Sequence, residues 1–310
     1  MESLNRMAIE LVDEALEFDE ELNVGAYELE NGATVIDMGL EFDGGIEAGL
    51  LCTEIQTAGL ATPGRDLGEI GDVPIPYVEL STDQPAIALL CSQKASWEVT
   101  TDDFEGLGSG PARALVAEET EFHRVGYTDA FEFTALAVET ETLPTPAVAK
   151  QIADLAEVDT SGVFVLAYPT ASVVGSVTSA ARVAELAIFN LTELGYDPLE
   201  IVSATGRAPV PPVAGDEEVA IGRANDAIAY GGSAHLVVRQ DFDGFDRILS
   251  SAPEEHGRPF VDVFDDEGWS FEGTAADLFG PARVTVDVLG GPTYAFGETD
   301  ESVLQASFGL

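Results

Sequence analysis

The stretch Tyr168–Leu194 reads Y-P-T-A-S-V-V-G-S-V-T-S-A-A-R-V-A-E-L-A-I-F-N-L-T-E-L, and the fold of the chain is organised around it. The apolar run that precedes it, Val163–Ala167, predicts a buried strand. Pro169 ends the strand, and the small residues that follow predict a tight turn where another group approaches the backbone. Apolar spacing then predicts a helix that begins near Thr178.

Arg182 and Glu185 lie on the first turns of this predicted helix. They are three residues apart, so they share one helical face. A strand, a small-residue turn and a helix with such a pair suit a site of chemistry. On spacing alone, a solvent-exposed ion pair is the simpler interpretation, because such pairs are common and stabilise little. The pattern leaves both interpretations open.

The charge of the chain is its strongest compositional signal. Among 310 residues, 57 are acidic and 13 basic, which gives a net charge of −44. This balance excludes a broad basic face for nucleic-acid phosphates or anionic membranes. The apolar content of 45% and its regular periodicity exclude disorder and supply a large core, more typical of two domains than of one.

The cations divide unevenly, with eleven Arg and two Lys, Lys94 and Lys150. An acidic surface nearly free of Lys resembles those of proteins from salt-loving cells. In molar salt the Debye length is ~3 Å, so the self-repulsion of such a surface is screened. The acidity therefore indicates adaptation to the solvent, and each remaining cation is more significant than usual.

Cysteines and histidines show no metal-site spacing. Cys52 and Cys91 sit in apolar segments, which predicts buried free thiols. His123, His235 and His256 are scattered, so no metal site is expected.

No apolar run approaches the ~18 residues of a spanning helix, and the N-terminus is acidic and amphipathic rather than a signal peptide. We expect a soluble, cytoplasmic protein.

Strands and helices alternate without a strict βαβ period, which predicts α/β layers in two lobes rather than a Rossmann fold. We expect an N-terminal lobe of residues 1–115 and a C-terminal lobe of 116–310, either of which a crossover can make discontinuous. Local patterns predict a helix at 3–17, a hairpin at Asn31–Gly32, a strand at 50–58, an ordered loop at 61–74 and a helix capped by Asp216.

Two cations lie in unusual positions. Lys94, next to Gln93, emerges from an apolar run that begins at Pro85. Either its stem packs while its ammonium group reaches water, or it binds a ligand. Arg113 lies on the first turn of a helix after Gly106, Gly108 and Gly110. That geometry can hold an anion, although the segment is neither a P-loop nor G-x-G-x-x-G, and a plain helix N-terminus is the simpler interpretation.

Several ordered blocks along nearly the whole chain together resemble the methenyltetrahydromethanopterin cyclohydrolase family of one-carbon metabolism. They are N-G-A-T-V-I-D at 31–37, T-D-Q-P-A-I-A at 82–88, S-Q-K-A at 92–95, G-S-G-P-A-R-A at 108–114, P-T-A-S-V-V-G-S-V at 169–177, R-V-A-E at 182–185, G-R-A-N-D-A-I-A-Y-G-G at 222–232 and F-G-P-A at 279–282. Gln84 and Ala224 are small departures inside these blocks. Because so many blocks occur in order, the resemblance is far more specific than any single motif.

The resemblance implies an archaeal, homotrimeric enzyme with a substrate cleft between its two lobes, and the composition described above makes it a salt-adapted member. The implied reaction hydrolyses the methenyl bridge of the pterin carrier to the N5-formyl compound, without a metal, a nucleotide or a prosthetic group. The catalytic Arg and Glu of the family correspond to Arg182 and Glu185.

The resemblance also gives roles to the other polar residues of the blocks. Lys94 and Arg113 are the candidates for the anionic tail of the coenzyme. Gln93, Asn225 and Asp226 are the candidates for hydrogen bonds to the pterin edge. A tetrahydrofolate-type carrier and a non-catalytic pterin-binding protein stay open as alternatives.

Overall fold

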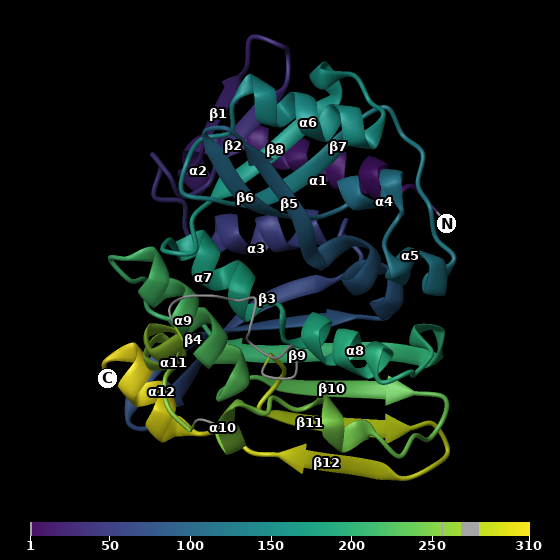
Figure 1. Ribbon diagram of the computed structural model, residues 1–310, viewed down its shortest axis with the longest axis vertical. Helices are drawn as coiled ribbons and strands as arrows, with labels where there is room; N and C mark the ends of the chain where they lie inside the picture. The colour runs from purple at the N-terminus through teal and green to yellow at the C-terminus, as the bar shows by residue number, and fades with distance from the viewer. Residues whose placement is uncertain (1, 256, 268–278) are drawn as a thin grey trace. The chain divides into compact units, whose positions relative to one another are not determined.

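The computed structural model describes residues 2–255, 257–267 and 279–310, and Figure 1 shows their helices and strands. The chain forms two compact units. The first contains the chain up to Thr62 together with Ala86–Thr178, and the second contains Pro63–Pro85 and Ser179–Leu310. Both units are discontinuous, so the division differs from a single boundary after residue 115. The predicted cleft between the lobes stays a prediction.

A six-stranded mixed sheet forms the centre of the first unit. Its order is β1 (Gly25–Glu28), β2 (Thr34–Asp37), β8 (Val163–Tyr168), β7 (Thr134–Glu139), β6 (Phe104–Ser109) and β5 (Ala95–Thr101). The inner strands β2, β8 and β7 are parallel, and the outer pairings are antiparallel. β1 and β2 form the predicted hairpin, in which Gly32 has a φ of +83°. The predicted strand 163–167 is confirmed as β8.

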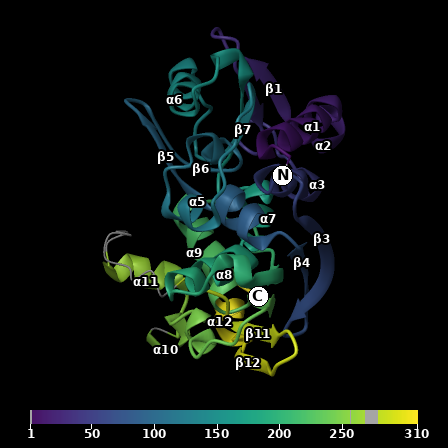
Figure 2. The same cartoon turned by 90° about the vertical axis from the view of Figure 1, so that its right-hand side faces the viewer.

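Helices cover both faces of this sheet. Figure 2 shows α1 (Leu4–Glu17) and α3 (Ile46–Gln56) on one side of β7 and α6 (Pro146–Ala156) on the other. α1 confirms the helix predicted at 3–17, and it buries Leu4, Ala8, Val12 and Ala15 at helical spacing. The remaining elements of this unit are α2 (Asp19–Leu22), the π-helix η1 (Ala86–Gln93), α4 (Ala112–Val116), α5 (Thr120–Val125), the short η2 (Thr160–Gly162) and α7 (Val173–Ala180).

A second mixed sheet, in the second unit, has the order β12 (Thr293–Gly297), β11 (Arg283–Val288), β10 (Ser233–Val238), β9 (Ile201–Pro209), β4 (Val73–Thr82) and β3 (Thr62–Ile70). β10 and β11 are parallel, whereas β9 is antiparallel to both of its neighbours. Neither of the described sheets is uniformly parallel. The predicted α/β layers in two lobes, rather than a Rossmann sheet, are therefore confirmed.

The helices α8 (Val183–Glu193) and α9 (Glu217–Ala229) pack against this second sheet. The contact between α8 and β9 is close, because a Cβ added at Gly206 would lie 2.4 Å from the backbone nitrogen of Ala184. Asp216 caps α9 as predicted, accepting a hydrogen bond from the Val219 amide. The other helices are η3 (Pro198–Glu200), η4 (Phe245–Ile248), α10 (Ala252–Glu255), α11 (Phe260–Glu267) and α12 (Glu301–Phe308).

Two local predictions are wrong. Residues 50–58, predicted as a strand, lie mostly in α3, which is buried on nearly all sides. A short apolar run has the same appearance in a buried strand and in a buried helix. Residues 61–74, predicted as a loop, form β3 and the start of β4. β3 is an edge strand, and an edge strand tolerates the Gly and Pro residues that suggested a loop.

Candidate active site

A break between two helices precedes the candidate pair. The helix predicted from Thr178 is instead two helices: α7 ends at Ala180, and α8 begins at Val183. The small residues before them form the expected close turn, because a Cβ at Gly175 would lie 2.3 Å from the carbonyl oxygen of Pro169. The Ser172 hydroxyl accepts a hydrogen bond from the Gly175 amide and so caps the start of α7.

Arg182 occupies the N-cap position of α8, and Glu185 lies in the first turn of that helix. The Arg182 Nη1 lies 3.0 Å from the Glu185 Oε2, and the two side chains are only 13% and 4% exposed. The positive end of the helix dipole also favours a carboxylate in this turn. This burial rejects the interpretation of a solvent-exposed surface pair. The arrangement holds a charged carboxylate, largely shielded from water, at a defined place.

A second group of candidate residues gathers in the first unit. Lys94 follows η1, and its Nζ lies 2.8 Å from the Glu121 Oε1 and 3.4 Å from the Glu119 Oε2. Its side chain keeps 17% of its surface exposed. The backbone amide of Lys94 donates to the carbonyl of Leu89, five residues earlier, which is the wide spacing of a π-helix. Such π turns are frequent at functional sites.

Arg113 lies in the same group but is fully buried. Its Nε and Nη2 donate to the two carboxylate oxygens of Glu119, at 2.9 and 2.6 Å. Its terminal nitrogens also donate to the carbonyls of Leu90 and Ser92. These bonds use all five donors of the guanidinium group. Arg113 thus ties η1 to the α4–α5 segment, and a ligand anion would have to displace one of these bonds.

The carboxylate of Glu119 is held in its charged form. Burial raises its pKa, but the hydrogen bond and charge of Arg113, with Ser96 and Lys94, outweigh burial and lower the pKa below its usual value. Gln93 is also fully buried in this group, at the end of η1. Glu119 and Glu121 are the members that the sequence analysis missed. Their only sequence signal is an acidic stretch a few residues after Arg113.

The remaining candidates belong to the second unit. The side-chain Nδ2 of Asn225 donates to the Ile221 carbonyl of its own helix at 2.8 Å. Asp226 is fully buried, accepting from the Phe260 amide at 3.0 Å and the Ser307 hydroxyl at 2.6 Å. Burial raises the pKa of Asp226 to about 7. Asp226 therefore joins α9 to the start of α11 and the end of α12, and the predicted contact with a pterin stays untested.

The seven candidates are thus divided between the two units. Lys94, Gln93 and Arg113 belong to the first unit, and Arg182, Glu185, Asn225 and Asp226 to the second.

Comparison with known proteins agrees with the blocks quoted above. Residues 3–308 match the family model described as cyclohydrolase (MCH). The chain belongs to this methenyltetrahydromethanopterin cyclohydrolase family. It is 57% identical to the methenyltetrahydromethanopterin cyclohydrolase of Halobacterium salinarum, over the whole of both chains. Proteins of the same name from Methanocella arvoryzae and Methanospirillum hungatei are 41% and 38% identical, over all of this chain and 99% of theirs.

For this member of the cyclohydrolase family, the described residues contain no group of three or more His, Cys, Asp or Glu side chains that could hold a metal ion. Cys52 and Cys91 are buried thiols that form no disulfide within the described residues, as predicted, and burial raises the pKa of Cys91 to about 12. His235 pairs with Asp287 at 2.9 Å, and His256 lies outside the described residues.

No helix in the described part of this chain has the length and apolarity to cross a bilayer.

Proposed function

We propose that this protein hydrolyses the methenyl bridge of 5,10-methenyl-tetrahydromethanopterin to give N5-formyl-tetrahydromethanopterin in one-carbon metabolism. Full-length relatives that carry the name of this enzyme support the proposal. The single structural observation that supports it most is the shielded ion pair of Arg182 and Glu185.

The reaction needs a base beside a cationic carbon. The bridge carbon is part of an amidinium-like cation, and water must attack it. Glu185 would take a proton from that water as general base, and its negative charge would favour the cationic substrate. The product of this step is a neutral hydroxylated bridge and a protonated Glu185.

The second step breaks one carbon–nitrogen bond of the bridge. Protonated Glu185 would return its proton to the departing nitrogen, while the hydroxyl group on carbon loses its proton to solvent and becomes the formyl oxygen. One water is consumed and one proton is released overall. A single carboxyl group thus acts first as base and then as acid.

Arg182 has a positioning role in this proposal. Its guanidinium group, 3.0 Å from Glu185, fixes the direction of the carboxylate and favours the ionised form that the first step needs. A shielded carboxylate without such a partner would tend to bind a proton.

The binding roles follow from exposure and remaining hydrogen-bond capacity. Lys94, which is partly exposed, is the better candidate for the anionic tail of the carrier, because the donors of Arg113 are all engaged. Gln93 and Asn225 are candidates for the pterin edge.

We also propose a salt-adapted, cytoplasmic homotrimer that uses no prosthetic group, in line with the family resemblance and the net charge of −44.

The direct test follows the loss of the methenyl chromophore in about 2 to 3 M salt, where the surface charge is screened. Methenyl-tetrahydromethanopterin and methenyl-tetrahydrofolate are compared at equal concentration. We expect hydrolysis of the first to exceed that of the second. Faster hydrolysis of the folate compound would reassign the carrier, and binding of either compound without turnover would indicate a non-catalytic pterin-binding protein.

A further inference from the structure

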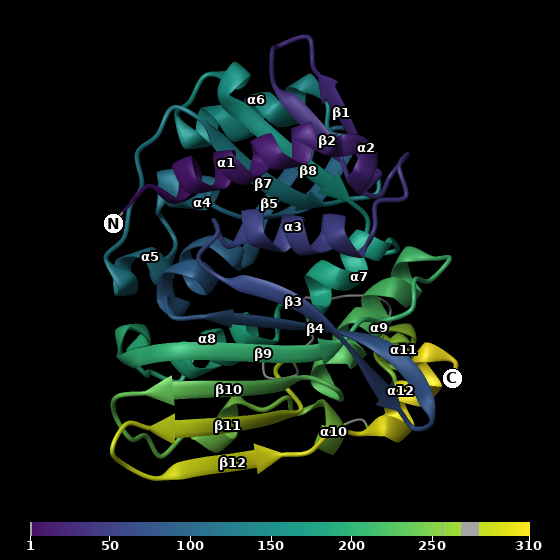
Figure 3. The same cartoon turned by 180° about the vertical axis from the view of Figure 1, so that it is seen from behind.

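The first unit has a hollow at the edge of its sheet. It has a volume of about 420 Å³, and the residues that line it come from α2, from the edge strand β1 and from the loop after β2. Figure 3 shows α2 and β1 side by side at this edge. All of the lining belongs to the first unit. The proposed reaction gives this hollow no role.

Two aromatic rings form one wall of the hollow. The ring centroids of Tyr27 and Phe42 are 6.4 Å apart, with 66° between the ring planes. Phe42 lies against Gly25, where a Cβ would be only 2.3 Å from the ring, and it keeps 37% of its surface exposed. Two rings at such an angle form a corner, so a group bound in the corner can contact both.

Carboxylates form the other wall. Asp19 and Glu20 of α2 line the hollow, and the Tyr27 hydroxyl donates to the Oε2 of the neighbouring Glu41 at 3.2 Å. Within the described residues, none of these three carboxylates has a basic side chain at ion-pair distance. The hollow therefore combines uncompensated negative charge with aromatic faces.

The loop that carries Phe42 is held from both sides. Asp37 is fully buried at the end of β2, and its carboxylate accepts three backbone amides of the loop at 2.7 to 3.0 Å. Further along, the Gly44 amide donates at 3.0 Å to the carbonyl of Asn23, which lies between α2 and β1. The hollow is thus formed before a ligand binds, which lowers the entropic cost of binding.

We propose that this hollow binds a small alkylammonium ion, whose nitrogen carries carbon groups in place of most or all of its hydrogens. Such a cation is attracted to the faces of aromatic rings. Its alkyl groups fill the corner of Tyr27 and Phe42, while Asp19 and Glu20 supply the opposite charge. The volume lies in the range of small-molecule sites, about 300 to 1,000 Å³. The site is independent of the proposed reaction.

Inorganic cations and neutral molecules fit the hollow less well. K⁺ sheds its hydration shell where several oxygen ligands replace it, and ring faces do not provide them. A neutral apolar molecule would leave the carboxylates beside it without a counter-charge. In molar salt the Debye length is ~3 Å, so contact with the rings should contribute more to selectivity than distant charge does.

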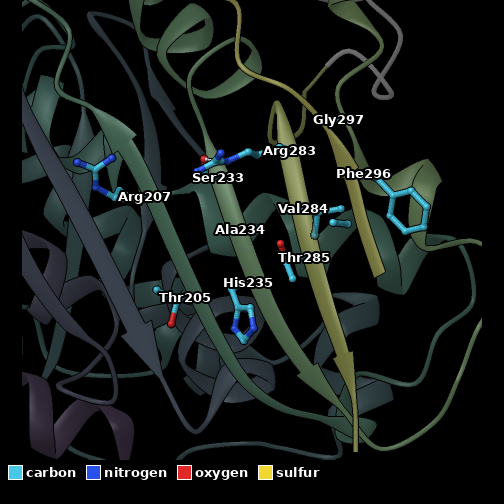
Figure 4. A pocket seen from close by; sticks show the side chains of 11 residues that line it. Thr205, Arg207, Ser233, Ala234, His235, Arg283, Val284, Thr285, Phe296 and Gly297 are labelled. Atoms are coloured by element: carbon cyan, nitrogen blue, oxygen red, sulfur yellow. Dashed lines mark hydrogen bonds between the residues drawn. The ribbon is translucent and has the colours of Figure 1, made fainter. Parts of the chain in front are cut away.

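A hollow over the second sheet lacks this combination. Its volume is about 460 Å³, and Phe296 is the one aromatic residue among those that line it. Figure 4 shows the Arg283 side chain beside Ser233, whereas Arg207 is turned away from both. The two guanidinium groups do not converge on one point, so this hollow offers no comparable site.

Isothermal titration calorimetry with choline chloride tests the proposal in ~3 M KCl, where the surface charge is screened. The matched probe is the neutral alcohol in which a carbon atom replaces the charged nitrogen of choline. We expect choline to bind at one site, at least tenfold more tightly than the alcohol, because only the cation is attracted to the ring faces. Equal binding of the two probes, or no saturable binding of choline, would overturn the proposal.

Substitutions in the aromatic wall locate the site. Phe42→Leu and Tyr27→Leu each remove one ring and should weaken choline binding by about three- to tenfold, whereas Tyr27→Phe keeps the ring and should bind like the wild type. Phe133→Leu is the matched control, because Phe133 is a similarly exposed ring of the same unit that pairs with Phe131 outside the hollow. If Phe42→Leu does not fold, the two Tyr27 variants give the same comparison.

Glu185→Gln separates this hollow from the proposed reaction site, because the substrate of that reaction is also a cation. Choline should bind equally well to Glu185→Gln and to the wild type. Binding that Glu185→Gln abolishes and Phe42→Leu retains would place choline at the catalytic carboxylate, and the proposed hollow would be wrong. Circular dichroism of each variant confirms that a loss of binding is not a loss of fold.

Discussion

The two units each contain a shielded Arg–Glu pair, and the two pairs differ in how the arginine is used. In the first unit, Arg113 has no exposed surface and all five donors committed to Glu119 and two carbonyls. In the second, Arg182 retains 13% exposure and lies at a break between two helices. Because cations are scarce in this sequence, both arginines were candidates for a specific role. Their surroundings distinguish a structural pair from a candidate catalytic pair.

The largest expected effect is on catalysis. Glu185→Gln keeps the size of the side chain but removes the base, so we expect kcat for methenyl hydrolysis to fall by roughly 10²- to 10⁴-fold. Steady-state assays in high salt measure the loss. Glu193→Gln, at the exposed end of the same helix, is the control and should stay near wild type. Unchanged hydrolysis by Glu185→Gln would remove the proposed mechanism.

Breaking the pair of Arg113 and Glu119 should instead lower the stability of the folded protein. Arg113→Met leaves the carboxylate of Glu119 without its main partner, and breaking one side of a buried pair costs about 3 to 5 kcal/mol. We expect the free energy of unfolding in denaturant to drop by that amount, with kcat of the folded enzyme little changed. Arg182→Met also removes a partner of a shielded carboxylate and should lose stability too, but unlike Arg113→Met it should in addition lower kcat strongly. Equal effects of the two substitutions would erase the distinction between the pairs.

Asp226 is a buried carboxylate whose pKa moves in the opposite direction from that of Glu119. Burial raises its pKa from 3.8 to about 7, so the folded state binds this proton more tightly than the unfolded state. Its stabilising contribution is complete below about pH 4 and is lost as the pH rises through about 7. Relative to Asp226→Asn, wild-type stability should therefore fall across this window, by on the order of 4 kcal/mol.

Denaturant unfolding of both proteins at several pH values between 4 and 8 measures this difference. The asparagine variant keeps an acceptor for the Phe260 amide, so both proteins should fold alike. Parallel stability curves for the two proteins would show that Asp226 does not titrate in this range.

Local patterns predicted much of the fold, and tertiary context explains the failures. The hairpin at Asn31–Gly32 and the cap at Asp216 depend on a few adjacent residues, and both are confirmed. The strand predicted at 50–58 failed because burial on nearly all sides removes the periodicity that marks a helix. The π-helix η1 has no such periodic signal at all.

The candidate site, like the fold, was predictable only where it depends on residues close together in the sequence. The three-residue spacing of Arg182 and Glu185 predicted that the two side chains meet, and they do. Their burial was not predictable, because it depends on packing between distant segments. The partners of Lys94 come from 25 and 27 residues further along the chain, which no local motif connects to it.

The smallest expected effect tests whether Lys94 resembles Arg113 or has a role with substrate. Lys94 shares Glu119 with Arg113, yet keeps some exposure, so it is intermediate between the two cases. If it holds the anionic tail of the carrier, Lys94→Ala should raise KM by roughly tenfold, about 1.4 kcal/mol, with little change in kcat. The exposed Lys150, which pairs with the exposed Asp154 of its own helix, provides the control in Lys150→Ala. An equal fall in kcat and kcat/KM would assign Lys94 to the chemical step, whereas a loss of stability alone would make it structural, like Arg113.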